Sequence, residues 1–138
     1  MSSFAIVSQP LNGVDFVFID GAFLIGALAE LGHMIKREMK EIRGARGCTE
    51  SADIVASSKV NSDIDIGFRK RADGSYECIA DWLELEKAGL DREEFIKEVA
   101  QKYSYLKTID QAKKEGYQVV EEKNEVDGSI RVKLRQYK

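Results

Sequence analysis

Residues 63–68, with the sequence DIDIGF, decide the fold class because apolar and polar positions alternate along them. The two isoleucines and Phe68 lie on one side of an extended chain, whereas Asp65 and Gly67 lie on the other side. This period of two is typical of a β-strand that buries one face and leaves the other in solvent. We therefore expect Asp63 and Asp65 to occupy a solvated face of a sheet.

The segment after this strand predicts a β-hairpin. The next apolar stretch, YECIADW, alternates again, so that Tyr76, Cys78 and Ala80 share one face. The connection contains Asp-Gly-Ser at 73–75, and the same three residues recur at 127–129. Asp-Gly is favoured in tight hairpin turns, and neither copy has the spaced carboxylates of a calcium-binding loop. Both copies are therefore interpreted as turns.

Two helices are predicted by apolar positions that recur every three or four residues. Asp20 is a favourable N-cap for the first helix, and Gly32 stands where a left-handed C-cap would end it. Asp91 opens the second helix, which continues to Gly116. The apolar stripe of the second helix comprises Phe95, Val99, Tyr103, Leu106, Ile109 and Ala112. Residues 33–43 are compatible with either a helix or a strand.

Short apolar segments supply the remaining strands. FAIV at 4–7, FVFID at 16–20 and ADIVAS at 52–57 have strand-like composition. Together these elements predict an α+β fold, with a mainly antiparallel sheet of about six or seven strands and two principal helices packed on one face. The chain length of 138 residues fits a single domain over residues 1–138.

The composition argues against several classes of protein. The net charge of −3 at pH 7 does not favour a nucleic-acid partner for the molecule as a whole. The longest apolar run, within residues 21–32, is shorter than the roughly 18 residues that a bilayer-spanning helix needs. The opening segment MSSFAIVSQP lacks the basic region of a secretory signal. We therefore expect a cytoplasmic protein that does not contact a membrane.

Catalytic, metal and cofactor sites are not expected. One histidine, His33, and two cysteines, Cys48 and Cys78, cannot supply the four ligands of a usual zinc site. His33 stands beside a helix end and is expected in a capping or surface role. Nearby arginines would lower the pKa of Cys48 if this thiol were exposed, but a reduced, incidental cysteine is the simpler interpretation. No carboxylate pair is fixed at the separation that acid–base catalysis requires. The sequence therefore indicates a non-enzymatic protein without a cofactor.

Two basic stretches are candidate binding surfaces. Residues 36–46 carry five basic residues against two acidic ones. Three basic residues of the last strand alternate with apolar ones and are expected on a solvated face: Arg131, Lys133 and Arg135. Leu134 is expected on the opposite, buried face, and Tyr105 lies off the apolar stripe of the second helix. These stretches support a nucleic-acid-binding module as the alternative to a protein-binding adaptor.

Eight segments of the chain, in order, are MSSF, ALAELG, RGARG, ADIV, DIGF, ECIAD, QKYSYLKTIDQAKKEGYQVVEE and DGSIRVKLRQY. Together they resemble a family of small hypothetical chloroplast reading-frame (ycf-type) proteins, found in plastid genomes, cyanobacteria, other bacteria and phages. The family is classed as a domain of unknown function. This chain departs from it at Ser3, where relatives usually have a histidine, and at Tyr137, where they often have a tryptophan. The hairpin FRKRADGSYE is also longer than the one that relatives usually have.

The resemblance implies no established catalytic activity. Bacterial members are often encoded beside AAA-type ATPases, which implies an accessory or adaptor role through a protein partner. Apart from the resemblance, a homo-oligomer is left open. The resemblance also favours a first helix that ends at Gly32. The family-like positions are Arg43, Gly44, Arg46, Gly47, Asp65, Gly67, Asp81, Tyr103 and Tyr105. The residues expected to bind a partner or an anion are Arg43, Arg46, Tyr105, Arg131, Lys133 and Arg135.

Overall fold

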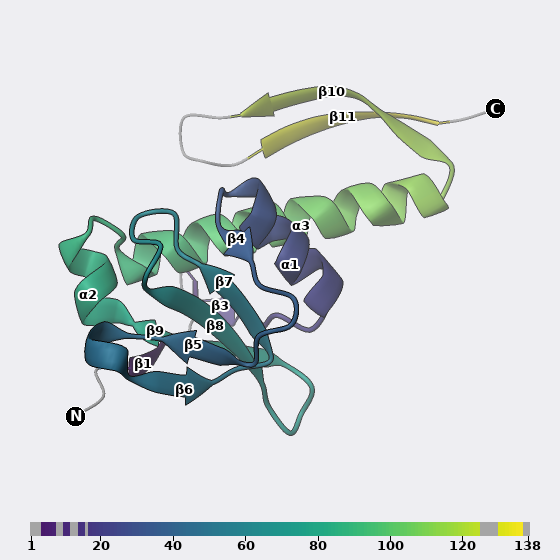
Figure 1. Cartoon of the computed structure of the whole chain (residues 1–138). Coiled ribbons are helices and arrows are strands. Elements are labelled where there is room, and N and C mark those ends of the chain that lie inside the picture. The colour runs from purple at the N-terminus through teal and green to yellow at the C-terminus, as the bar shows by residue number, and fades with distance from the viewer. Residues whose placement is uncertain (1–3, 8–9, 12–13, 16, 125–129, 137–138) are drawn as a thin grey trace.

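The structure is a computed structural model, and it describes residues 4–7, 10–11, 14–15, 17–124 and 130–136 (Figure 1). The strands are β1 (Phe4–Val7), β2 (Pro10–Leu11), β3 (Val14–Asp15), β4 (Met34–Ile35), β5 (Glu41–Arg43), β6 (Thr49–Ser51), β7 (Ile54–Ser57), β8 (Asp65–Lys70), β9 (Tyr76–Asp81), β10 (Tyr117–Asn124) and β11 (Ile130–Gln136). The helices are α1 (Gly21–Glu30), α2 (Trp82–Lys87) and α3 (Arg92–Lys114), with a single 3₁₀ turn, η1 (Ala45–Gly47).

The central sheet has five strands in the order β1-β9-β8-β7-β4, and its neighbouring strands are antiparallel. The expected hairpin joins β8 to β9, with Phe68 opposite Cys78. This arrangement confirms the predicted α+β class. The prediction of six or seven strands in one sheet is wrong, because β2–β3, β5–β6 and β10–β11 form separate two-stranded ribbons. In the described part of FVFID, only Phe18 pairs, through an isolated bridge to Tyr76.

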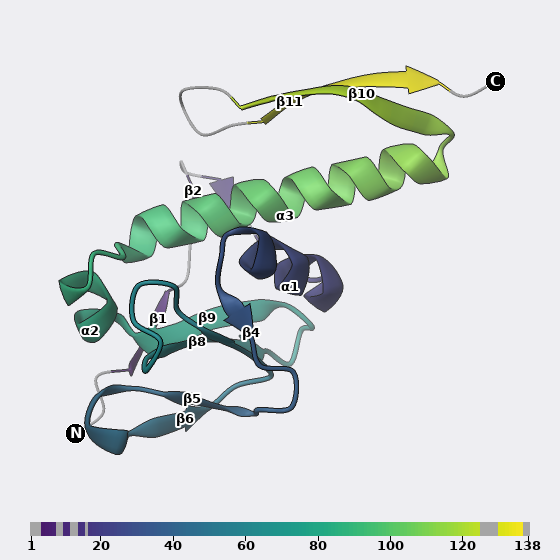
Figure 2. The ribbon, with the colours of Figure 1, turned by 45° about the horizontal axis from the view of Figure 1, so that its top comes forward.

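One face of the sheet packs against α1 and α3, as predicted, and Figure 2 shows both helices on that side. Ile66 and Phe68 of β8 are buried in the same cluster as Leu24 and Leu28 of α1 and Val99 of α3. These side chains come from the apolar positions that the two periodicities identify. The main hydrophobic core therefore lies between the sheet and the two principal helices.

The opposite face of the sheet is covered by the β5–β6 hairpin (Figure 2). Ile42 of β5 and Ala52, just after β6, are buried against Val55 of β7 and Ile79 of β9. The expectation of a solvated second face is wrong, since Asp65 on this face has an exposed fraction of 0%. Alternation along one strand reveals the two faces of a sheet but not what covers each of them.

Residues 33–43 form two short strands and their connection, not a helix. Gly32 has a φ of 95°, so the left-handed conformation ends the helical segment there as predicted. The chain then pairs β4 with β7 at the edge of the sheet, with Met34 opposite Ser57. It continues into β5, which pairs with β6. The break at Gly32 thus sends the chain from the helical side of the sheet to the opposite side.

Both predicted ends of the long helix α3 are confirmed. The Asp91 carboxylate accepts a hydrogen bond from the backbone N–H of Glu94 at 3.0 Å, and Gly116 has a φ of 91° just beyond the last turn. Near the middle of α3, the Tyr103 hydroxyl oxygen accepts hydrogen bonds from the backbone N–H groups of Ile19 and Asp20, at 3.0 and 2.9 Å. These bonds fix α3 to the start of α1.

Gly67 provides a test of how closely the β5–β6 hairpin approaches the sheet. A Cβ atom at this position would lie 2.7 Å from both the Ala52 Cβ and the Ile42 Cγ2. We expect Gly67→Ala to destabilise the protein by about 1–3 kcal/mol, because a well-packed interface must shift to accept the methyl group. Chemical unfolding followed by circular dichroism measures this loss.

The matched variants are Ala52→Gly alone and the Ala52→Gly/Gly67→Ala double variant, which moves the methyl group across the interface. We expect the double variant to be more stable than the sum of the two single losses, because one of the two close contacts is then absent. Strict additivity would contradict the close approach of the two chains.

Candidate functional site

A buried carboxylate fixes the β5–β6 hairpin to the sheet. The Oδ2 atom of Asp65 accepts hydrogen bonds from the Arg43 Nε and from the Arg43 backbone N–H, both at 2.9 Å. Its Oδ1 atom accepts from the Lys36 Nζ at 3.0 Å and from the Arg43 Nη2 at 3.1 Å. The Arg43 Nη2 also donates to the carbonyl oxygen of Ser62 at 2.6 Å. Asp65 thus binds two cations, Lys36 before β5 and Arg43 at the end of β5.

This network sets the ionisation of its members. Burial would raise the pKa of Asp65, but hydrogen bonds from Arg43 and Lys36 outweigh burial and hold the pKa of this carboxyl below its usual value. The side-chain hydrogen bond to Asp65 also raises the pKa of Arg43. Because its guanidinium is bound to Asp65, Arg43 acts first as a structural residue. Its predicted contact with an anionic partner is not tested by this geometry.

A second buried carboxylate fixes the loop that follows β5. Asp81 has an exposed fraction of 1%, and its Oδ2 accepts a hydrogen bond from the backbone N–H of Ala45 at 2.9 Å. Its Oδ1 accepts from the backbone N–H of Glu84 at 3.4 Å, which caps the start of α2, a helix that the sequence did not predict. A Cβ atom on Gly44 would lie 2.7 Å from the ring of Phe4. The family-like segments RGARG, DIGF and ECIAD therefore meet at one interface.

Arg46 differs from Arg43 in both backbone and side chain. It has a φ of 58°, the left-handed region that residues other than glycine seldom adopt, and its side chain is exposed. A φ of 58° does not call for an arginine side chain, whereas the neighbouring Gly47, with a φ of 74°, uses the freedom of glycine. A residue that has an exposed side chain and a strained backbone conformation is a candidate functional residue.

The β10–β11 hairpin forms the second candidate surface. It lies along α3, beyond the helical side of the sheet, and neither strand pairs with a third strand within the described residues (Figures 1 and 2). Its principal contacts with the rest of the described chain are to α3. The ladder has an irregularity between Val119 and Glu121 of β10, whereas β11 runs without interruption from Ile130 to Gln136.

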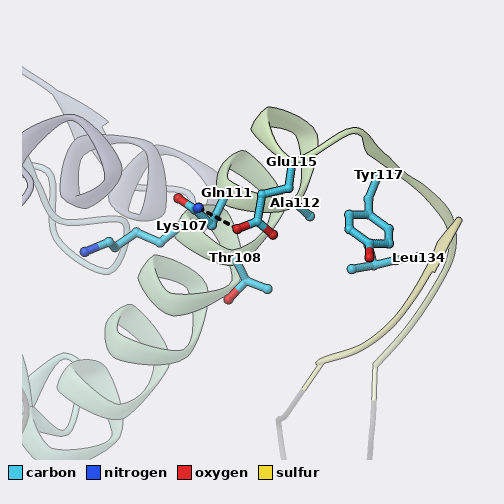
Figure 3. Close-up of a pocket in the computed structure, with 7 residues that line it drawn as sticks. All are labelled: Lys107, Thr108, Gln111, Ala112, Glu115, Tyr117 and Leu134. Carbon is cyan, nitrogen blue, oxygen red and sulfur yellow. Dashed lines mark hydrogen bonds between the residues drawn. The ribbon is translucent and has the colours of Figure 1, made fainter. Parts of the chain in front are cut away.

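A groove of about 580 Å³ separates the hairpin from the second half of α3 (Figure 3). On the hairpin side, the ring of Tyr117 and the side chain of Leu134 face the helix (Figure 3). The helix side is lined by Lys107, Thr108, Gln111, Ala112 and Glu115. Gln111 Nε2 donates a hydrogen bond to Glu115 Oε1 at 3.0 Å along this wall. The expectation that Leu134 is buried is wrong, since its exposed fraction is 38%.

The basic residues of β11 lie on the other face of the hairpin. Successive side chains of a strand point to opposite faces, so Lys133 and Arg135 point away from the groove that Leu134 lines. Arg131 shares their face, and all three side chains are exposed, as the sequence predicts. This surface, made of Arg131, Lys133 and Arg135, is called the basic face below.

The predicted binding residues do not form a single site. The end of β5 and the η1 turn, which carry Arg43 and Arg46, lie at the opposite end of the molecule from β11 (Figure 2). Tyr105 lies on α3, half-buried, with the Lys102 Nζ 5.5 Å from its ring centroid. Within residues 36–46, Lys36 and Arg43 bind Asp65. A nucleic-acid interface that uses both basic stretches would therefore need two separate surfaces.

His33 and Cys78 are buried, whereas Cys48 is partly exposed. The backbone N–H of His33 bonds to the carbonyl oxygen of Leu28 at 3.1 Å, which fits a capping role, but its ring is buried and not on the surface. Burial, together with nearby Lys59, lowers the pKa of His33 to about 4. Burial also raises the pKa of the Cys78 thiol. Cys48 is partly exposed beside Gly47.

Within the described residues, no three His, Cys, Asp or Glu side chains are grouped as a metal ion would require. Along the same described parts of the chain, no helix combines the length and apolar character needed to cross a membrane.

The chain belongs to a family of proteins of unknown function. The sequence profile described as "Protein of unknown function (DUF1257)" matches residues 27–133, which confirms the resemblance seen in the sequence. The chain is 30% identical over 99 residues to "Uncharacterized protein ycf35" of Cyanophora paradoxa, covering 72% of this chain and 74% of that protein. It is 28% identical over 111 residues to "Uncharacterized protein ycf35" of Pyropia yezoensis, covering 80% and 84%. No solved structure matches this chain significantly.

Removing the buried charge tests the network around Asp65. We expect Asp65→Asn to destabilise the protein by about 2–3 kcal/mol, since Arg43 and Lys36 lose their carboxylate but retain partial contact with water. Asp63→Asn, at an exposed neighbouring carboxylate, is the matched control and is expected within about 0.5 kcal/mol of the parent protein.

The pH dependence gives a second measure of the same network. The folded-state pKa of Asp65 is depressed, so its contribution is complete above the unfolded-state pKa of about 4 and is lost as the pH falls through the folded-state value. The stability difference between the parent protein and Asp65→Asn should therefore shrink below about pH 4. A difference that is independent of pH from 7 to 3 would contradict the assignment.

Arg46→Gly tests whether the strained arginine serves the fold. We expect this variant to be as stable as the parent protein or up to about 1 kcal/mol more stable, because glycine adopts the left-handed conformation without steric cost. Arg46→Ala removes the charge but keeps the strained backbone conformation, so the stability of this variant should equal that of the parent protein. Thermal unfolding distinguishes these outcomes. A clear loss of stability in Arg46→Gly would show that the arginine side chain supports the fold.

Proposed function

We propose that this chain is a non-catalytic, protein-binding adaptor that uses the β10–β11 hairpin to hold an extended, acidic segment of a partner protein. The observation that carries the proposal is a regular strand edge on β11 beside three exposed basic side chains. An extended segment that pairs with such an edge gains backbone hydrogen bonds, while its acidic side chains meet the basic face.

The two strands of the hairpin are not equivalent as docking edges. The ladder irregularity on β10 disturbs the spacing of its donors and acceptors, and such bulges protect an edge from pairing. β11 is regular over its 7 residues. A two-stranded ribbon is also only marginally stable on its own in water, so a third strand would stabilise it. Both points favour an added strand along β11.

The charge on β11 favours a different protein as the occupant over a second copy of this chain. In a symmetric dimer, two β11 edges would bring Arg131, Lys133 and Arg135 of both copies together. Like charges on neighbouring strands repel one another, whereas an acidic strand neutralises them. The partner class implied by the family resemblance, an AAA-type ATPase, and a cytoplasmic location are retained as parts of this proposal.

The test compares two double charge reversals in the full chain. A protein recovered from native lysate, after high salt and nuclease treatment, is identified, purified and titrated calorimetrically against each variant. We expect Lys133→Glu/Arg135→Glu to weaken binding by roughly tenfold or more, about 1.4 kcal/mol, because acidic side chains then face an acidic strand. The control variant, Arg37→Glu/Lys70→Glu, makes the same charge change at two exposed positions outside the hairpin, one shortly after β4 and one at the end of β8. It should change affinity less than about twofold.

Three results would contradict the proposal. Equal loss of affinity in both variants would show only a general charge effect. Recovered material that nuclease removes would favour the nucleic-acid alternative. A failure to recover a protein that binds the purified chain would leave the basic side chains with the simpler role of keeping the β11 edge from pairing.

A further inference from the structure

We infer that the hairpin selects a partner segment in which apolar and acidic residues alternate. This inference rests on the proposed function and specifies the chemistry of the occupant. It follows from the two faces of the hairpin, which differ in the side chains that they present beside the same strand edge.

The geometry of an added strand requires this alternation. A strand paired with β11 sends successive side chains to opposite faces of the enlarged sheet. On one face, its side chains lie beside Lys133 and Arg135. On the other face, they lie beside Leu134, at the wall of the groove over α3 (Figure 3). One set of alternate side chains therefore meets positive charge, and the other set meets an apolar wall.

The groove is suited to small or medium apolar side chains. Its apolar surface is contributed by Ala112 of α3 and by Tyr117 and Leu134 of the hairpin. The Gln111 amide is already bound to Glu115 along the helix. Lys107 points away from the hairpin, and its Nζ lies 3.8 Å from the Asp20 carboxylate (Figure 3). Lys107, Gln111 and Glu115 of the helix wall thus have contacts of their own, and the exposed part of Leu134 gains most by being covered.

Charge determines which of the two alternating sets is acidic. The basic face contains three exposed cations in successive odd positions of β11. Acidic residues at every second position of the added strand lie on the same face at the spacing of a β-ladder. A uniformly acidic segment would instead place carboxylates against the apolar groove wall, where they lose hydration without gaining a cation.

The experiment uses three synthetic eight-residue peptides with the full chain, measured by calorimetry at peptide concentrations at which each peptide is monomeric. One alternates valine with glutamate, the second alternates serine with glutamate, and the third alternates valine with lysine. We expect the valine–glutamate peptide to bind, the serine–glutamate peptide to bind at least roughly tenfold more weakly, and the valine–lysine peptide not to bind.

Leu134→Ser connects the peptide preference to the groove. We expect this variant to lose affinity for the valine–glutamate peptide several-fold and to leave the serine–glutamate affinity unchanged, because only the first peptide covers the leucine. Leu83→Ser, at an exposed leucine of α2, is the matched control and should change neither affinity. Circular dichroism of each variant confirms that the fold is retained.

The outcomes separate this inference from the proposed function. If the serine–glutamate peptide binds as tightly as the valine–glutamate peptide, the groove does not select the occupant and the inference is wrong, while the basic face still binds an acidic strand. If no acidic peptide binds at millimolar concentration, or if a single-stranded oligonucleotide binds and the peptides do not, both the inference and the proposed docking surface are wrong.

Discussion

The fold depends on a single carboxylate that lies between the sheet and the hairpin covering it. A buried charge is stable only when its hydrogen-bonding capacity is satisfied, and Asp65 accepts four hydrogen bonds from Lys36 and Arg43. These donors lie on the segment that crosses from the edge of the sheet to its second face. The network therefore fixes both the path of residues 36–43 and the position of β5 over β8. The segment around β5 then lies close against the sheet. Gly67 and Gly44 provide the space for this close packing because neither residue has a Cβ atom.

This constraint explains why the most distinctive segments of the chain serve the fold. RGARG, DIGF and ECIAD contribute Arg43, Asp65 and Asp81 to one interface, where each polar group has an internal partner. A sequence comparison alone would single out the same residues as a binding site. The structure separates them by their contacts: Arg43 is bound to Asp65, whereas Arg46 is exposed and conformationally strained.

The sequence predicts those features that depend on neighbouring residues. The period of β8 and β9, the break at Gly32 and both ends of α3 are local properties, and the structure confirms them. The burial of Asp65 was missed because its cause, the hairpin at 41–51, lies outside β8 in the chain and covers this face of the sheet only in the folded structure. The start of α2 was missed because its cap, Asp81, also completes a strand. Likewise, the alternation along β11 predicts that the strand has two different faces. It does not predict the groove between β11 and α3, which leaves Leu134 partly exposed.

An adaptor needs at least two surfaces that bind independently, and this fold separates its two basic regions. Tyr103 anchors α3 to the start of α1, so the long helix carries the β10–β11 hairpin in a defined position beside the core. The Arg46 loop is held at the other end of the molecule by Asp81 and by the Asp65 network. A protein strand on β11 would leave that loop uncovered. Under the proposed function, the hairpin holds one partner while Arg46 stays available to an anionic group on another, and the rigid core between them sets the distance at which the two partners are held.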